Sequence, residues 1–143
     1  MANLPQHEER VLFQDHWLAK SLEKLMDIQR LGHDWDGEGS LPITFAAVRG
    51  ALSFLTFLVD VYGNELPAPF ICPVSGGGIQ LEWTAQDRHL EVEFAPDGRI
   101  LFLQDEQGQM KTGELPSGHF HPLLRLLDWQ LARASVSVIG LVG

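Results

Sequence analysis

The clearest pattern along the chain is a strict alternation of apolar and polar positions within residues 79–94. The apolar positions form two series, Ile79, Leu81 and Trp83 in the first and Leu90, Val92 and Phe94 in the second. A period of two is typical of a half-buried β-strand with one face in water. The two segments therefore predict two neighbouring strands.

A four-residue loop at 85–88 would set the register of this hairpin. It places every apolar residue of one strand opposite an apolar residue of the other, with Glu82 opposite Glu91 and Gln80 opposite Glu93. A slip of one residue would carry the glutamates into the apolar face, so the register is strongly specified.

The next turn, Pro-Asp-Gly at residues 96–98, leaves two alternatives open. A type I turn with its glycine in the left-handed region pairs Val92 with Phe102. A two-residue turn would instead direct Leu101 and Leu103 inward. Either turn leaves two large apolar side chains beside the glutamates, and we select Phe102 as the candidate contact there.

Two segments before the sheet follow a helical period, residues 5–31 and residues 44–62. The first is expected to end before Gly32, and the second begins at Thr44 as N-cap and ends before Gly63. The second has little polar surface, which predicts a central core helix. The predicted buried stripes are Val11, Leu18, Leu22, Leu25 and Met26 in the first helix, widened by Trp17 and Ile28, and Phe45, Val48, Leu52, Leu55, Val59 and Tyr62 in the second.

Glycine and proline mark the remaining boundaries. Residues 32–44 form a loop, and residues 70–112 form the sheet, with Pro73 placing its strand at an edge. A third helix is predicted over 117–134. The apolar tail, residues 135–143, leaves an edge strand, docking on a neighbour and disorder as alternatives.

These elements predict one α+β domain over residues 1–143. Two N-terminal helices and a C-terminal helix flank a small antiparallel β-meander of three to five strands. A hydrophobic share of 45% and a charged share of 20% are typical of a globular protein and argue against wholesale disorder.

Charge and cysteine content narrow the functional classes. The net charge is −9 and no Lys/Arg cluster offsets it, so we expect no direct binding to nucleic acid. The single cysteine, Cys72, excludes an internal disulfide, and its apolar neighbours predict a buried, inert thiol. The first residues lack the features of a signal peptide, and no apolar run approaches the ~20 residues of a membrane helix. We therefore expect a cytoplasmic protein that does not bind membranes.

The loop after the first helix is the most concentrated polar stretch. As a calcium loop it would use Asp34, Asp36 and Glu38, but its twelfth position is Phe45 instead of a bidentate carboxylate. The favoured interpretation is a turn whose aspartates cap backbone amides while Trp35 fills the core. The alternative is a recognition loop that presents Trp35 and Asp36 to a partner.

Two further groups of side chains could bind a ligand or carry chemistry. His119 and His121 have the spacing that begins some metal sites. Glu82, Glu91 and Glu93 form an acidic patch on adjacent strands. This patch has three interpretations: a solvated face, a docking surface for a basic partner, or an acid/base pair.

Several short motifs carry a resemblance. They are Trp-Asp-Gly at 35–37, Pro42, Pro-Ala-Pro at 67–69, Gly-Gly-Ile-Gln-Leu-Glu-Trp at 77–83 and Leu-Glu-Val-Glu at 90–93. Together they resemble a family of small uncharacterised bacterial proteins with a Trp-Asp-Gly loop and a Gly-Gly-Ile-x-Leu-Glu-Trp β-hairpin. The resemblance covers residues 31–103 and implies no particular activity. The members are similar in size to the small genes of bacterial defence and toxin–antitoxin pairs.

The leading hypothesis is a non-enzymatic, acidic domain that binds a basic protein, as an antitoxin, immunity or adaptor subunit of a bacterial gene pair, without a cofactor. Its candidate contacts are Trp35, Asp36, Glu82, Glu91, Glu93 and Phe102. One alternative is a metal-dependent hydrolase or metal-binding protein, for which the candidate ligands are His33, Asp34, Asp36, His119 and His121. The other is a self-associating structural protein.

Overall fold

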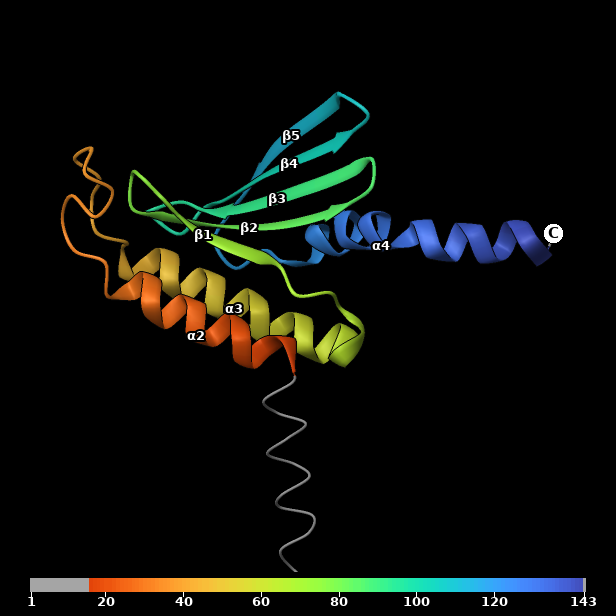
Figure 1. Cartoon of the computed structure of the whole chain (residues 1–143), viewed down its shortest axis with the longest axis horizontal. Coiled ribbons are helices and arrows are strands. Elements are labelled where there is room, and N and C mark those ends of the chain that lie inside the picture. The colour runs from red at the N-terminus through yellow and green to blue at the C-terminus, as the bar shows by residue number, and fades with distance from the viewer. Residues whose placement is uncertain (1–15, 143) are drawn as a thin grey trace, which may run out of the picture.

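The computed structural model describes residues 16–142 and has an α+β fold (Figure 1). In chain order its elements are α2 (Trp17–Gln29), α3 (Phe45–Tyr62), the 3-10 helix η1 (Gly63–Glu65), β1 (Phe70–Val74), β2 (Gly78–Ala85), β3 (Arg88–Phe94), β4 (Ile100–Glu106), β5 (Gln109–Leu115) and α4 (His121–Val142). The predicted fold class is confirmed, with helices α2 and α3 before the sheet and α4 after it.

The sheet has five strands in the order β1-β2-β3-β4-β5, and every neighbouring pair is antiparallel. The predicted register of the central hairpin is confirmed, because Glu82 lies opposite Glu91 and Gln80 opposite Glu93. The last strand continues to Leu115, three residues beyond the predicted end of the sheet.

The turn between β3 and β4 follows the first of the two alternatives. Gly98 has a positive φ of 92°, and its N–H donates to the carbonyl of Ala95 at 2.8 Å. Val92 lies opposite Phe102, so the two side chains share a face of the sheet. Phe102 therefore points to the same side as the buried core.

One face of the sheet is covered by the helices, as Figure 1 shows for α2 and α3. Its side chains form the core with residues of all three α-helices that the described chain contains. The large side chains that are less than 2% exposed are Phe54, Phe94, Ile28, Leu55, Leu58, Ile79, Leu81, Leu90, Ile100, Leu123, Leu127 and Val92. Burial of this apolar area is the main favourable contribution to folding.

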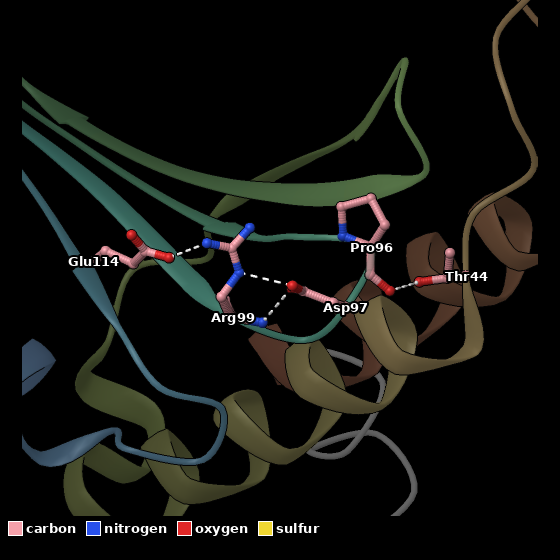
Figure 2. A network of polar contacts seen from close by, with 5 residues as sticks. All are labelled: Thr44, Pro96, Asp97, Arg99 and Glu114. Carbon is pink, nitrogen blue, oxygen red and sulfur yellow. Dashed lines mark hydrogen bonds and ion pairs between the residues drawn. The ribbon is translucent and has the colours of Figure 1, made fainter.

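Helix α3 begins and ends as predicted. The Oγ1 of its N-cap, Thr44, accepts the N–H of Ala47 at 3.1 Å and donates to the carbonyl of Pro96 at 2.6 Å (Figure 2). Gly63 ends the helix with a φ of 58°, a conformation that glycine adopts without strain. The cap thereby joins the helix to the β3–β4 turn.

The buried side of α3 differs from the predicted stripe. Phe45 is 73% exposed and Leu52 is 40% exposed. The residues that face the core are Ala47, Val48, Ala51, Phe54, Leu55 and Leu58. Because apolar residues occur on nearly every side of this helix, their spacing alone does not identify the face that packs on the sheet.

The segment Phe45–Glu65 is also long and apolar enough to cross a membrane by length and composition. The expectation that no segment has these properties is therefore wrong. Core helices of soluble proteins pass the same test. In this structure the helix packs against β2 and β3.

Helix α2 (Trp17–Gln29) is preceded by an extended residue, His16, whose Nδ1 accepts a backbone N–H of the first turn at 3.0 Å. The prediction of one continuous helix over residues 5–31 is therefore wrong at His16, and residues 1–15 lie outside the described part. Of the predicted stripe, Met26 is 52% exposed. The buried side chains are Trp17, Ser21, Leu25 and Ile28.

Helix α4 (His121–Val142) is longer than the predicted 117–134 and includes most of the apolar tail. An edge strand in residues 135–143 is therefore excluded as far as Val142. Near the start of the helix, Leu123 and Leu127 are fully buried in the core.

Polar contacts fix α4 on the sheet and on α3. The Arg88 guanidinium donates to the carbonyl of Trp129 and lies 5.2 Å from the centre of its ring. The Trp129 Nε1 donates to Glu106 Oε1 at 3.1 Å. The Tyr62 hydroxyl donates to Asp128 Oδ1 at 2.6 Å, and burial together with this carboxylate raises the pKa of the phenol.

Candidate functional site on the open face of the sheet

The face of the sheet opposite the helices forms the candidate site, which we term the acidic face (Figure 1). The strand register places no Lys or Arg at its positions. From β1 to β5, its side chains are Phe70, Cys72 and Val74, then Gln80, Glu82 and Thr84, then His89, Glu91 and Glu93, then Leu101, Leu103 and Asp105, and finally Met110, Thr112 and Glu114.

The three predicted glutamates lie together on this face. Glu82 and Glu91 are direct cross-strand partners, a position where like charges repel. Gln80 Nε2 donates to Glu82 Oε1 at 2.6 Å, and His89 Nε2 lies 3.0 Å from Glu91 Oε1. These contacts orient two of the carboxylates.

Glu93 is partly buried, and among residues 16–131, whose side chains the structure describes, no ion pair to its carboxylate is found. Burial, and secondly the charge of Glu91, raise the pKa of Glu93 above its usual value. The folded chain therefore retains a carboxylate whose charge is poorly stabilised.

This shift in pKa leads to a pH-dependent prediction. Because the pKa of Glu93 is higher in the folded state than in the unfolded state, the folded state binds more protons between the two values, and the stability contribution falls as pH rises through that interval. We expect Glu93→Gln to raise the melting temperature at pH 7 and to remove part of the decline in stability that occurs as the pH rises above the usual pKa of a glutamate. Thermal unfolding from pH 4 to 8 measures this. A lower melting temperature of the variant at pH 7 would contradict it.

Apolar side chains accompany the acids, but they are not the ones expected. Leu101 and Leu103 lie opposite Glu93 and Glu91, so they occupy the place predicted for Phe102. Phe102 packs against the core instead, with its ring across Gly113. The placement of Phe102 on the acidic face was therefore wrong, because the β3–β4 turn takes the longer of the two alternatives.

A shallow depression of about 500 Å³ lies in the middle of the acidic face. Its outward-facing lining includes Glu91, Glu93, Leu101, Leu103 and Glu114. Phe70 and Met110, at the two edges of the sheet, are each 64% exposed. The surface thus combines carboxylates with accessible apolar groups.

One acid of this face is already paired. Figure 2 shows the guanidinium of Arg99 between Asp97 and Glu114. Arg99 Nε donates to Asp97 Oδ2 at 2.7 Å, and the two carboxylates raise the pKa of the arginine. Glu114 is therefore less available to a partner than Glu91 or Glu93.

The loop at residues 32–44 uses its carboxylates internally. Asp34 Oδ1 accepts the Gly39 N–H at 2.6 Å, and Asp36 accepts from the Glu38 N–H at 2.9 Å and from the Ser40 hydroxyl. The hydrogen bond from Ser40 is the main cause that lowers the pKa of Asp36. These contacts agree with the predicted capping turn.

Trp35 also has an internal partner, because its Nε1 donates to the carbonyl of Leu41 at 2.9 Å. Its side chain is only partly buried, so it does not fill the core as expected. Neither Trp35 nor Asp36 contacts the three glutamates through any described interaction. Partner binding by this loop stays a prediction.

The predicted metal ligands do not assemble. His119 and His121 are exposed, and the His121 ring packs against Phe57 with the centroids 5.8 Å apart. Where side chains are described, in residues 16–131, one group of three has ligand atoms close enough to hold a metal, and it consists of Glu82, His89 and Glu91.

Cys72 lies beside Gln80 at the edge of the acidic face. Burial, and then the nearby glutamates, raise the pKa of its thiol. Cys72 is only partly buried, so the predicted burial is wrong, whereas a raised pKa reduces the thiolate fraction and agrees with an inert cysteine.

The fold and site define a class of protein: an α+β protein whose antiparallel meander is covered by helices on one face and carries an acidic, partly apolar surface on the other. Comparison with protein families, curated proteins and solved structures finds no match for the chain.

Proposed function

We propose that the protein binds a basic protein partner through its acidic face. The observation that carries this proposal is the pairing of Glu91 and Glu93 with Leu103 and Leu101 on a sheet face that the helices leave open. Contiguous accessible apolar area rimmed by polar groups is typical of protein interaction sites.

The charges favour a basic occupant. The acidic face has no Lys or Arg at its strand positions, and Glu93 carries a poorly stabilised carboxylate. A cation from a partner would relieve that cost and would exclude water from Leu101 and Leu103 at the same time. Charge complementarity of this kind accelerates association and sets specificity. Binding of a basic protein agrees with the role expected for this chain, that of an antitoxin, immunity or adaptor subunit.

The test compares proteins captured from the lysate of cells that carry the gene. We expect wild type to retain a basic protein at moderate salt and the double variant Glu91→Gln/Glu93→Gln to lose it. The two substitutions remove the charges of the face without changing the size of its side chains. With the captured protein in purified form, the affinity should fall about tenfold or more, which corresponds to ~1.4 kcal/mol or more. The melting temperature should not fall.

The matched control is Asp27→Asn/Asp60→Asn, which removes the same formal charge from exposed positions of α2 and α3. It should bind as wild type does, because binding depends on the face and not on total charge. Equal loss in both double variants would reduce the interaction to non-specific electrostatics and refute the proposal. Unchanged binding of the face variant would also refute it.

A further inference from the structure

We propose that Glu82, His89 and Glu91 bind a divalent transition-metal ion of the zinc type on the acidic face. Their ligand atoms, one imidazole nitrogen and two carboxylate oxygens, all lie within 4.8 Å of one another. This inference concerns a different ligand from the protein partner and does not depend on it.

The backbone explains why these three side chains meet. Glu82 and Glu91 are cross-strand partners in β2 and β3, and His89 precedes Glu91 by two residues, so it points to the same face. The His89 Nε2 and Glu91 Oε1 are 3.0 Å apart. Two ligands of one tetrahedral zinc ion lie about 3.3 Å apart, given zinc–ligand distances of about 2.0 to 2.1 Å. Glu82 contributes the second carboxylate from the facing strand, within 4.8 Å of the other two ligand atoms.

Outer contacts hold the ligands in the orientation that a metal requires. Thr84 Oγ1 lies 2.7 Å from the second ring nitrogen of His89, Nδ1, which leaves Nε2 directed at the glutamates. Gln80 donates to Glu82. Metal-binding histidines characteristically have such a partner at the other nitrogen, because it fixes the tautomer and the ring plane.

Electrostatics favour occupation by a cation. Glu82 and Glu91 face each other directly, and Glu93 is next along the strand. The side chains of His89 and Glu91 are each 29% exposed, so water screens their charges only in part. A dication would replace repulsion between carboxylates with attraction.

The ligand types select the metal. An imidazole nitrogen favours zinc and its neighbours over magnesium and calcium, which prefer oxygen ligands alone. Three protein ligands leave a fourth position for water, the arrangement found in zinc sites that remain open to a further ligand.

The test is calorimetric titration of the full chain, expressed without a histidine tag, with Zn²⁺ alone. We expect one ion per chain, a rise in melting temperature, and reversal by a chelator. Mg²⁺ and Ca²⁺ should not reproduce the binding.

Variants assign the site. His89→Ala and Glu91→Gln should each weaken Zn²⁺ binding by more than tenfold, and Thr84→Val, which removes only the outer contact, by about 10- to 100-fold. His119→Ala is the matched control and should bind as wild type does, because His119 lies outside the group. Absence of Zn²⁺ binding, or equal losses in His89→Ala and His119→Ala, would overturn the proposal.

Discussion

Replacement of Phe94 with alanine is expected to lower the free energy of unfolding by ~3–5 kcal/mol. Phe94 is fully buried, and the centre of its ring lies 5.7 Å from the centre of the Phe54 ring. The position of a Cβ on Gly50 would lie 2.9 Å from the Phe94 ring, so α3 approaches the sheet closely there. Alanine would leave a cavity where helix and sheet meet. Urea denaturation at 25 °C, with midpoint and slope compared, measures the loss.

The matched control is Phe70→Ala on the acidic face. Phe70 is 64% exposed, so its truncation should change the free energy of unfolding by less than about 0.5 kcal/mol. A loss at Phe70 as large as that at Phe94 would contradict the assignment of the covered and open faces. The pair of variants therefore tests which side of the sheet is the core.

Gly78→Ala is expected to destabilise the fold by ~1–3 kcal/mol, although it adds only one methyl group. A Cβ at Gly78 would lie 2.7 Å from the carbonyl oxygen of Phe94. That atom belongs to the backbone of the neighbouring strand, so it cannot move aside as a flexible side chain could. The start of β2 would have to separate from β3. Urea denaturation again provides the measurement.

Gly76→Ala, two residues earlier, is the control. A Cβ at Gly76 would have no atom within 4 Å, and its φ is not positive. Alanine there should leave the protein as stable or slightly more stable, because it restricts the unfolded chain. If Gly76→Ala proved as damaging as Gly78→Ala, the loss would come from backbone conformation and not from the close approach of β2 to β3.

The hairpin register was predictable because charge made every alternative costly. A shift by one residue would bury Glu82, Glu91 and Glu93, and no local contact could offset that. The β3–β4 turn gave no such constraint, since Ile100–Leu103 is apolar throughout and either face accepts it. The position of Phe102 could therefore not be decided from the pattern. Phe102 was selected as the contact, whereas the other open alternative, Leu101 and Leu103, provides the apolar neighbours of the acids.

The helical stripes were correct only in part, for a related reason. In α3, Phe45 and Leu52 fit the apolar spacing as well as Phe54 and Leu58 do, and only contact with the sheet separates them. In α2 the small polar residue Ser21 is buried while Met26 is exposed, which reflects how closely the helix approaches its neighbours. Periodicity identifies a helix but does not report packing distance.

The candidate site was partly predictable. The three glutamates followed from alternation, whereas His89 was considered only as a possible contributor to a metal site with other histidines, although the same register places it opposite Thr84. The alternation of the hairpin continues by one more outward-facing pair, from Glu82 and Glu91 to Thr84 and His89, and this pair could have been recognised from the sequence. His119 and His121 were candidate ligands only because of their spacing in the sequence, and the fold does not bring them to the carboxylates.

The order of the strands has a consequence for how the chain folds. Each strand pairs with its neighbour in sequence, so every step of the sheet closes only a short loop. Such closures cost little chain entropy, and topologies rich in local pairing cross a lower kinetic barrier. The contacts between distant parts of the sequence are those of the helices, with α4 docking on β2 and β3 after the meander has been synthesised. The sheet can thus assemble hairpin by hairpin, and the docking of the first turns of α4 then covers strands from the middle of the chain.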